Sequence, residues 1–405
     1  MYFEGKITIG KNTKDEVISL MPNMLNRHGM VMGATGSGKS NTIRVLAESF
    51  SSCGIPVLLT DFKGEMSGLC TPGEKNDSIN SIEELFLEKQ GFKYEAYPAV
   101  FWDFFGEIGL PFRVTLNELG PDILSIFLDL NRASSDILRI VYRIAEDEGL
   151  LLIDTKDLRA TLNYIKEKIE DYNLEYGGLS VVGIDKVIRS IAVMETKGAD
   201  LFLGEPSVNV RDFIGCDFSG KGEIHILNCQ KLYSNQKYSA LFLLYIMNEL
   251  VNCLPETEDM EKPRLSIIVS EAHSFFEIRE KYSIQQINQL FYQLQKRGVS
   301  LFFESQEPHD IPIEVAGRFG TKILHSIRVY TPNEENEFKK LTKVIGDSNQ
   351  FSTMNEAKIL GLGEVIVSTL DENGIQTMAE KCKIFPPESF VGPLDYKKLD
   401  SYIKS

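Results

Sequence analysis

The sequence predicts an α/β protein with a mostly parallel sheet, a helical insertion and a C-terminal β-hairpin. Two observations carry this prediction. Short apolar runs recur between helical stretches, and near-continuous apolar strands are typical of a parallel sheet that is covered on both faces. Helical periodicity also dominates one long central stretch, from Pro121 to about Asp200. The apolar runs that return after this stretch are 223–228, 265–269, 299–303 and 322–327.

The first buried strand, Met30–Met32, runs into a glycine-rich loop. Residues Gly33–Ser40 read Gly-Ala-Thr-Gly-Ser-Gly-Lys-Ser, the G-x-x-x-x-G-K-[ST] pattern of a phosphate-binding loop. Its glycines let the backbone form a concave nest whose N–H groups point at phosphate oxygens. Lys39 is expected to reach the β and γ phosphates, and Ser40 offers a hydroxyl to Mg²⁺. The sequence therefore predicts that the chain binds a nucleoside triphosphate.

The context of this loop supports the prediction. Ile43, Leu46 and Phe50 follow the loop at helical spacing, and Gly54 ends the pattern. A strand before the loop and a helix after it argue against a chance Gly/Ser-rich segment. The residues expected to bind the nucleotide are Gly33, Ala34, Thr35, Gly36, Ser37, Gly38, Lys39, Ser40 and Asn41.

The next apolar strand, 55–61, ends in a charged turn that contains Asp61, Lys63 and Glu65. Ligands of open α/β sheets bind at the carboxyl ends of the strands, so these side chains are expected to face the phosphate site. A solvated charged turn explains the same three residues equally well.

The strands fall into two blocks, 1–110 and 215–405, which are expected to form one core. Residues 111–214 are expected to form a mainly helical insertion in it. The aromatic cluster 101–105 resembles a platform for stacking bases, but aromatic residues at a strand end belong more often to the core. Near the C-terminus, Asn373-Gly374 suits a hairpin turn between two further strands, which are expected at 364–370 and 375–384.

The strand 265–269 leads directly into Ser270-Glu271-Ala272-His273. A nucleoside triphosphatase of this type carries an acidic pair here, in which the first residue holds the water shell of Mg²⁺ and the second activates water. Glu271 is therefore the expected catalytic base. A glutamate after an apolar strand is common in isolation, and the upstream phosphate-binding loop is what favours the catalytic interpretation.

The strand 299–303 ends in Glu304-Ser305-Gln306-Glu307-Pro308. An amide at a strand end, such as Gln306, can contact the γ-phosphate or orient the attacking water. The alternative is a local hydrogen bond in the turn before Pro308.

Two arginines are candidates for a role in trans. Arg297 follows Lys296 at the end of a predicted helix, where two cations interact favourably with the helix dipole. The alternative is a catalytic role, in which Arg297 is an arginine finger that reaches the nucleotide of a neighbouring subunit. Arg328, at the end of the next strand, competes for this role.

The composition excludes several classes of protein. A formal net charge of −15 argues against a surface that coats nucleic acid non-specifically, although a narrow basic channel is compatible with it. The six cysteines form no C-x-x-C pair and the five histidines no metal-ligand spacing, so neither a zinc ribbon nor a disulfide framework is indicated. No secretory signal and no bilayer-spanning apolar run is visible, so a cytoplasmic protein that does not enter a membrane is expected.

Further short motifs are spread along nearly the whole chain. They are Asn26-Arg27-His28-Gly29, Asp61-Phe62-Lys63-Gly64-Glu65, residues 143–150 and 156–160, Ser305-Gln306 with Asp310-Ile311-Pro312, and Val391-Gly392-Pro393-Leu394. Together with the phosphate-binding loop, they resemble the HerA/FtsK superfamily of P-loop ATPases, within the HerA-like bacterial helicase family typified by YjgR.

The resemblance implies a RecA-like P-loop NTPase core, ATP and Mg²⁺ as cofactors, and ATP hydrolysis at subunit interfaces. It implies a homo-oligomeric ring, typically a hexamer, whose central pore can thread DNA. By position, Glu271 takes the general-base role and Gln306 senses the γ-phosphate. Arg297 matches the trans-acting arginine only approximately.

Two departures from the family pattern matter. The Mg²⁺-side aspartate of the family is replaced by Ser270, whose hydroxyl can still hydrogen-bond the water on the metal. Slower hydrolysis or weaker Mg²⁺ affinity can follow. Fewer than 40 residues precede the loop, which leaves no room for the N-terminal β-barrel through which archaeal HerA proteins meet nucleases. A nuclease partner is therefore not expected.

Two functional hypotheses follow. The first is an oligomeric Mg²⁺-dependent ATPase that acts as a DNA translocase or helicase-like motor. The second is a nucleotide-gated assembly module with slow hydrolysis, whose output is a protein partner. Ser270 and the acidic balance of the chain motivate the second hypothesis.

Overall fold

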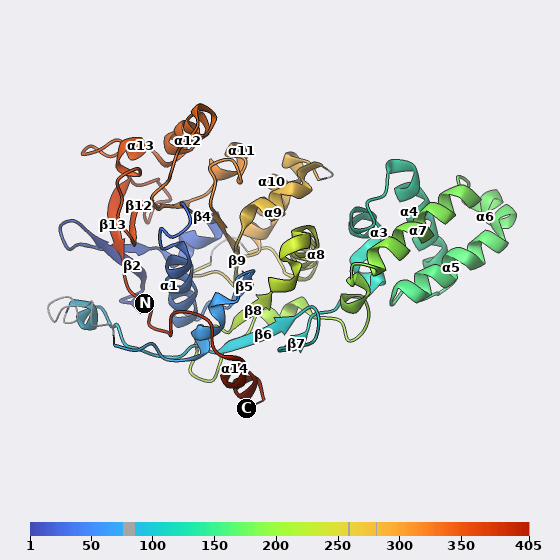
Figure 1. Ribbon diagram of the computed structural model, residues 1–405, viewed down its shortest axis with the longest axis horizontal. Helices are drawn as coiled ribbons and strands as arrows, with labels where there is room; N and C mark the ends of the chain where they lie inside the picture. Colours follow the sequence, from blue (N-terminus) through green and yellow to red (C-terminus); the bar gives the residue numbers. More distant parts are fainter. Residues whose placement is uncertain (76–85, 258–259, 281, 405) are drawn as a thin grey trace. The chain divides into compact units, whose positions relative to one another are not determined.

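The computed structural model describes residues 1–75, 86–257, 260–280 and 282–404. The chain forms two compact units (Figure 1). Unit 1 comprises Met1–Phe101, Val210–Lys237 and Met247–Ser405, and unit 2 comprises Trp102–Asn209 and Tyr238–Ile246. The predicted domains, a core of 1–110 with 215–405 and an insertion of 111–214, stay a prediction.

Unit 1 is built on a mixed sheet whose centre is parallel. The strands run in the order β1-β2-β13-β12-β11-β4-β10-β9-β5-β8, and β3 pairs with β2. The pairs from β11 to β8 are parallel, and β12, β13, β2 and β1 form an antiparallel edge. The bounds are β1 Tyr2–Phe3, β2 Lys6–Asn12, β3 Val17–Leu20, β4 Gly29–Met32, β5 Val57–Asp61, β8 Ile224–Asn228, β9 Leu265–Val269, β10 Val299–Ser305, β11 Thr321–Leu324, β12 Glu364–Ser368 and β13 Glu380–Ile384.

The predicted α/β fold class is thereby confirmed, including the C-terminal hairpin. In that hairpin β12 pairs with β13 in antiparallel register, with Val365 opposite Cys382. The segment with Asn373-Gly374 turns the chain between the two strands, where the N–H of Gly374 donates to the carbonyl of Asp371 at 3.0 Å. Both strands are shorter than expected: the first ends at Ser368, and the second begins only at Glu380. The connection between them is therefore longer than a tight two-residue turn.

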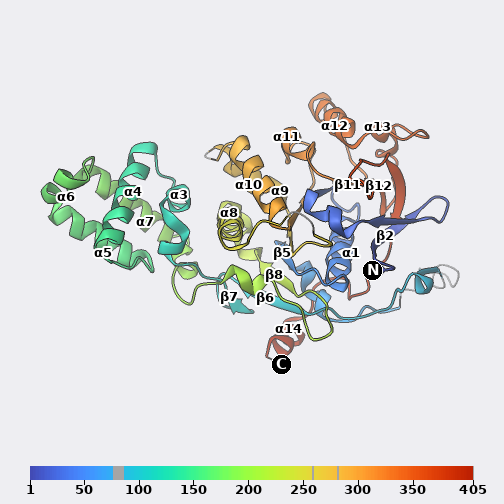
Figure 2. The ribbon, with the colours of Figure 1, turned by 180° about the vertical axis from the view of Figure 1, so that it is seen from behind.

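Helices of unit 1 follow the strands of the sheet. Figure 2 shows α12 and α13 beside β12, as does Figure 1. In the described part of the chain no helix is long and apolar enough to cross a membrane. The helices are α1 Lys39–Ser52, α9 Ala272–Phe276, α10 Ile284–Lys296, α11 Ile313–Ala316, α12 Pro332–Ile345, α13 Thr353–Glu356 and α14 Tyr396–Ile403, and α8 Gln236–Cys253 has its central residues in unit 2.

Strand β10 shows how the two faces of the sheet are covered. Successive side chains of a strand point to opposite faces, and all seven residues of β10 are buried. The ring of Phe302 lies 5.3 Å from that of Phe50 on α1. The ring of Phe303 lies 5.6 Å from that of Phe275 on α9 and 5.4 Å from that of Phe291 on α10. Every second residue of β10, including Phe302, therefore faces α1. This is the face of the sheet that α1, the helix after the phosphate-binding loop, covers.

Unit 2 is mainly helical. Its helices are α3 Leu116–Phe127, α4 Arg132–Asp147, α5 Thr155–Glu167, α6 Ile169–Glu175 and α7 Val181–Glu195. Capping side chains define several starts, for example Asp154, which accepts hydrogen bonds from two N–H groups of the first turn of α5. Strand β6 (Ala99–Asp103) crosses from unit 1 into unit 2, where it pairs with β7 (Leu110–Pro111).

The aromatic cluster is part of the protein core, as the favoured interpretation predicts: Phe101 belongs to the core of unit 1, and the residues from Trp102 on belong to unit 2. Phe104 is fully buried, and its ring lies 4.9 Å from that of Phe112 and 5.0 Å from that of Phe242. Trp102 is buried as well. These rings pack against each other, which leaves them no face for stacking a base.

Candidate nucleotide site

The phosphate-binding loop connects β4 to α1, and its glycines have distinct roles. A Cβ on Gly33 would lie 2.4 Å from the Cβ of His325, so close packing requires glycine there. Gly36 adopts a φ of +79°, a conformation that side chains disfavour, and nothing lies within 4 Å of where its Cβ would be. The loop therefore keeps an open concave side at Gly36.

Two hydrogen bonds anchor the start of the loop to the neighbouring strands. The N–H of Gly33 donates to the carbonyl of Ser305, and the N–H of Ala34 donates to that of Ser326. The N–H groups of Gly36, Gly38, Lys39 and Ser40 donate to no acceptor among the described residues. Unpaired N–H groups at the N-terminus of a 14-residue helix form a binding site for an anion.

Ser37 supports the same conclusion. Its hydroxyl is buried inside the loop and finds no hydrogen-bond partner in the part of the chain that the structure describes. A buried polar atom without a partner is costly, and a bound phosphate oxygen would accept from this hydroxyl. The loop thus fits a nucleotide phosphate in its backbone and in its side chains.

Lys39 lies folded over its own loop. Its Nζ donates to the carbonyl of Gly33 at 2.6 Å and to that of Ala34 at 3.1 Å, and lies 3.6 Å from Oε1 of Glu304. The side chain is only 5% exposed, and burial lowers the pKa of Lys39 although the Glu304 carboxylate opposes this shift. The ammonium group therefore lies at the mouth of the loop, where it can exchange these partners for phosphate oxygens.

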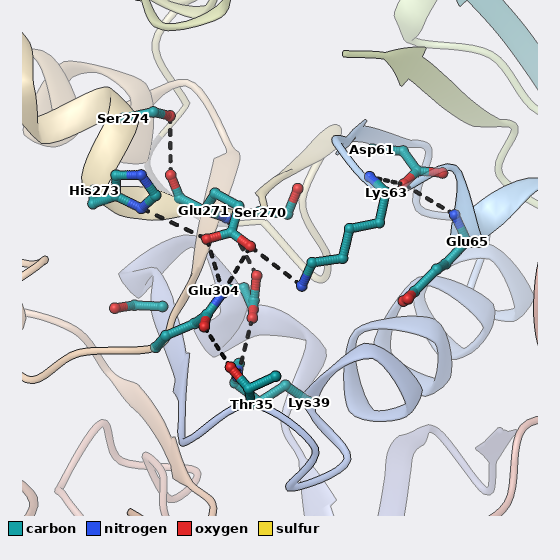
Figure 3. Close-up of polar contacts among 12 residues, drawn as sticks. Thr35, Lys39, Asp61, Lys63, Glu65, Ser270, Glu271, His273, Ser274 and Glu304 are labelled. Carbon is teal, nitrogen blue, oxygen red and sulfur yellow. Dashed lines mark hydrogen bonds and ion pairs between the residues drawn. The ribbon is translucent and has the colours of Figure 1, made fainter. Parts of the chain in front are cut away.

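Glu271 follows β9 and points at the loop (Figure 3). Its carboxylate lies 3.2 Å from Nζ of Lys63 and accepts hydrogen bonds from Nε2 of Gln306 at 2.9 and 3.1 Å. The residue is buried and has a left-handed backbone with φ of 54°. A non-glycine residue pays about 1 kcal/mol or more for such a conformation, and strained residues of this kind cluster at functional sites.

Gln306 links this carboxylate to the phosphate-binding loop. Its amide oxygen accepts a hydrogen bond from Oγ1 of Thr35 at 2.7 Å, while its amide nitrogen donates to Glu271. The amide therefore bridges the loop and the end of β9. The structure brings Glu271, Gln306 and the loop together, which is the arrangement that the sequence predicts at the carboxyl ends of these strands.

Ser270 lies beside the same site and bonds to the neighbouring strand. Its hydroxyl donates to the carbonyl of Thr60 at 2.6 Å, and its N–H donates to Oγ1 of Thr60 at 2.9 Å. Ser270 lines a small pocket together with Ser40, Glu271 and Glu304. The role expected for Ser270 and Ser40, holding Mg²⁺ directly or through water, stays a prediction.

The charged residues after β5 divide between a structural role in the turn and a place in the nucleotide site. The carboxylate of Asp61 accepts four backbone hydrogen bonds, among them those from Gly64 at 2.7 Å and Met66 at 2.8 Å, so it shapes the turn. Burial raises the pKa of Asp61, and these hydrogen bonds oppose the shift. Lys63 is the residue of the turn that reaches Glu271, whereas Glu65 lines the edge of the pocket.

Glu304 also belongs to the site, although the sequence did not predict it as a site residue. Its side chain on β10 is 5% exposed, and burial raises the pKa of its carboxyl while Lys39 opposes the shift. Oε2 of Glu304 accepts the N–H of Glu271 at 3.2 Å. An available signal was the presence of an acidic residue directly after five apolar or small residues in a buried strand.

The two arginines lie in different surroundings. Arg297 is at the amino end of β10, about 20 Å from the carboxyl end where the site lies, given the rise per residue of a strand. Its guanidinium donates to the carbonyls of Leu254 and Gln293 and to Glu256. Arg328 is exposed and makes no ion pair or hydrogen bond with any described residue. Neither arginine joins the site within the chain.

The metal requirements of the site agree with Mg²⁺ held by a nucleotide. The described residues contain no group of three or more His, Cys, Asp or Glu side chains that would hold a metal alone. Mg²⁺ is commonly bound through substrate phosphates, waters and only one or two protein oxygens. The pocket that joins Ser40 to buried carboxylates offers such oxygens.

A model of the helicase HerA-like C-terminal family matches residues 6–405. The chain belongs to this HerA-like family. It is 22% identical over 389 residues to the DNA double-strand break repair helicase HerA of Sulfurisphaera tokodaii, covering 91% of this chain and 67% of that protein. It is also 22% identical over 368 residues to the probable HerA helicase of Methanocaldococcus jannaschii, covering 85% of this chain and 69% of that one.

Solved structures agree with the HerA-like assignment at the level of the fold. VirB4 of Thermoanaerobacter pseudethanolicus matches with a TM-score of 0.58 and 14% identity, covering 95% of this chain and 98% of its own. The plasmid coupling protein TrwB in complex with ADP and Mg²⁺ matches with a TM-score of 0.59 and 12% identity, covering 90% and 88%. The family match confirms the resemblance to HerA-like proteins, and the solved structures show that the fold is shared.

Proposed function

We propose that this HerA-like chain is a Mg²⁺-dependent ATPase that works as a ring-forming motor on DNA. The observation that carries the proposal is the convergence of Lys39, Glu271 and Gln306 on one site. An anion-binding loop, a buried carboxylate and an amide that joins them are the groups that phosphoryl transfer to water requires.

In the proposed reaction the free N–H groups of the loop and Lys39 bind the triphosphate. Ser40 would ligate Mg²⁺ and Ser270 would contact it through water, and the metal would supply charge that neutralises the phosphates. Glu271 takes the proton of the attacking water, and Lys63, whose Nζ lies 3.2 Å from Oε1, helps to hold this carboxylate in place. Gln306 holds the water against the γ-phosphate.

The proposed assembly is a ring in which a neighbouring subunit completes each site. Two arginines are candidates for the group that arrives in trans. Exposure and the lack of a partner among the described residues favour Arg328, since Arg297 is 15% exposed in its side chain and would have to break three contacts. A hexamer is the expected state.

DNA is the proposed substrate because of the relatives. The archaeal relatives are named as DNA double-strand break repair helicases, and TrwB is named as a plasmid coupling protein. With a formal net charge of −15, DNA binding by this chain requires a local basic surface, such as the wall of a pore.

Two measurements test the proposal. ATP hydrolysis by the purified protein is expected to be Mg²⁺-dependent and to increase with single- or double-stranded DNA at low salt. The mass in solution, measured with and without an ATP analogue and DNA, is expected to show a ring. An ATPase rate that DNA leaves unchanged across a salt series, without DNA binding, would remove DNA from the proposal and leave the ATPase.

A second candidate is a nucleotide-gated assembly module that acts on a protein partner. The neutral Ser270 beside Glu271 favours it, because the metal-side carboxylate is absent at that position. The Ser270→Asp variant discriminates between the two functions. A large gain in hydrolysis would indicate a deliberately slow site, whereas little gain would favour the motor.

A further inference from the structure

The replacement of an aspartate by Ser270 leaves a charge missing from the nucleotide site. Ser270 is neutral, and its hydroxyl already donates to the carbonyl of Thr60. A Mg²⁺ ion that is ligated by Ser40 gains its water-shell contacts from carboxylate oxygens in most sites of this chemistry. The question is therefore whether another carboxylate reaches the same place.

Glu304 lies beside Ser270 on the adjacent strand. The parallel register pairs Phe303 of β10 with Val269, the last residue of β9, and extending this register by one residue sets Glu304 opposite Ser270. Side chains of one rank point to the same face of a parallel sheet, here the face of α1. Because β10 lies between β9 and β4, Glu304 is one strand nearer to the phosphate-binding loop than Ser270 is.

The two oxygens of the Glu304 carboxylate have different neighbours, and Oε1 is the one on the side of Lys39. Oε2 accepts the N–H of Glu271, whereas Oε1 lies 3.6 Å from Nζ of Lys39. Glu304 also lines the pocket that contains Ser40 and Ser270 (Figure 3 shows Glu304 between Glu271 and Lys39). A carboxylate at this point can accept hydrogen bonds from water molecules on a metal that Ser40 ligates.

Nucleotide binding would change the partner of Glu304. When Lys39 turns to the phosphates, the buried carboxylate of Glu304 loses the cation that lies nearest to Oε1. A buried charge without a partner is strongly unfavourable, and a hydrated cation at the same place would restore the balance. Nucleotide binding would thus move the ammonium of Lys39 away from Glu304 and bring the hydrated Mg²⁺ ion to it.

We propose that Glu304 replaces the missing aspartate, by accepting hydrogen bonds from the waters of nucleotide-bound Mg²⁺. The carboxylate that most sites of this type place on the strand before the catalytic base is here supplied by the neighbouring strand. This inference rests on the proposed nucleotide site and concerns the metal, not the assembly or the DNA.

The test compares nucleotide affinity with and without Mg²⁺. A fluorescent ATP analogue is titrated into wild type and the Glu304→Gln variant in Mg²⁺ and in EDTA, since this substitution keeps the shape of the side chain. The expected result is a loss of about 10- to 100-fold in the gain that Mg²⁺ confers, with unchanged or tighter binding in EDTA. Mn²⁺ binding to the protein–ADP complex, followed by electron paramagnetic resonance, should weaken in parallel.

Glu307→Gln is the matched control. Glu307 carries the same charge three residues further along the chain and is exposed, so its variant is expected to keep the full Mg²⁺ gain. A second variant moves the carboxylate back: Ser270→Asp added to Glu304→Gln is expected to restore most of the Mg²⁺ gain.

Three outcomes would overturn the inference in distinguishable ways. A Mg²⁺ gain in Glu304→Gln equal to that of wild type would show that the metal does not use this carboxylate. Equal tightening in Mg²⁺ and EDTA would show that Glu304 only restrains Lys39. Wild type that binds no nucleotide in either medium would remove the proposed function itself, together with the inference.

Discussion

The amide nitrogen of Gln306 lies 2.9 Å from Oε1 and 3.1 Å from Oε2 of Glu271, so the side chain directly after β10 orients both oxygens of the carboxylate after β9. The same amide accepts from Thr35 of the phosphate-binding loop. A carboxylate whose two oxygens both accept from one amide has a fixed orientation relative to the loop. This relationship makes Glu271 and Gln306 one unit, and the first predictions concern its members.

Glu271→Gln is expected to keep nucleotide affinity within a few-fold and to lose hydrolysis by about two to four orders of magnitude, since an amide cannot accept the proton of water. Single-turnover hydrolysis and binding of the fluorescent ATP analogue measure the two quantities separately. Hydrolysis at the wild-type rate in this variant would contradict the role of Glu271 as the base.

Thr35→Val removes the hydroxyl that donates to Gln306 and keeps the shape of the side chain. Because one hydrogen bond contributes about 0.5–1.5 kcal/mol, we expect kcat to fall by about 2- to 10-fold while the nucleotide dissociation constant changes little. Gln306→Ala should lose more, since it frees Glu271 as well. If Thr35→Val instead weakens nucleotide binding and leaves kcat alone, the hydroxyl contacts phosphate and does not position Gln306.

Lys39→Ala is expected to abolish measurable nucleotide binding, because the ammonium of Lys39 is the cation at the mouth of the loop. Removing the buried cation also leaves Glu304 without its nearest positive partner. Lys39→Met with thermal unfolding provides the control for folding. Wild-type affinity in a folded Lys39 variant would argue against phosphate binding by this loop.

The two arginine variants test the proposed ring. Arg328→Ala is expected to lower hydrolysis without lowering nucleotide affinity, and mixtures with wild-type subunits should lose more activity than their average. Arg297→Ala is expected to act mainly on stability, since its guanidinium ties Leu254 and Glu256 to the end of α10. The reverse pattern, with full turnover in Arg328→Ala and a mixed-subunit defect in Arg297→Ala, would assign the trans role to Arg297.

Three buried histidines predict a stability that falls in acid. Burial lowers the pKa of His28, His225 and His325 to about 4, below the value of 6.5 in an unfolded chain. The unfolded chain therefore binds the extra protons, and the free energy of unfolding decreases as the pH falls from about 6.5 to about 4. Each histidine accounts for up to about 3 kcal/mol at the acid end, from the size of its shift.

Urea unfolding at several pH values between 7 and 4 measures this loss. Nδ1 of His325 donates a hydrogen bond to the carbonyl of Ser37 in the phosphate-binding loop, and Nε2 is hydrogen-bonded to the hydroxyl of Thr42. His325→Gln is therefore expected to be less stable at pH 7 but to show a smaller decrease toward pH 4 than wild type. An equal decrease in the two proteins would mean that His325 does not stay neutral in the folded state.

Local patterns in the sequence predicted most of the fold. Apolar runs at 265–269 and 299–303 became β9 and β10, and the motif Gly33–Ser40 became a loop between a strand and a helix. Such features depend on contacts between near neighbours in the chain, and periodicity and glycine placement record them directly. The expected hairpin strands were too long, because the Asn-Gly signal places a turn but does not define the length of its arms.

The site was predictable only in part. Glu271 and Gln306 could be placed at strand ends from the sequence alone, because the carboxyl ends of parallel strands share one edge. The sequence could not decide between the two interpretations of Asp61 and Lys63. Only the fold shows that Asp61 closes its own turn while Lys63 reaches Glu271.

By itself, the sequence determined that this chain carries a phosphate-binding loop on a parallel sheet and resembles the HerA/FtsK superfamily. The tertiary structure alone decided which groups surround that loop. Glu304 is 265 residues away from Lys39 along the chain, and only the insertion of β10 between β4 and β9 brings the two within 3.6 Å. Strand order is a property of the packed sheet, and no local sequence pattern encodes it.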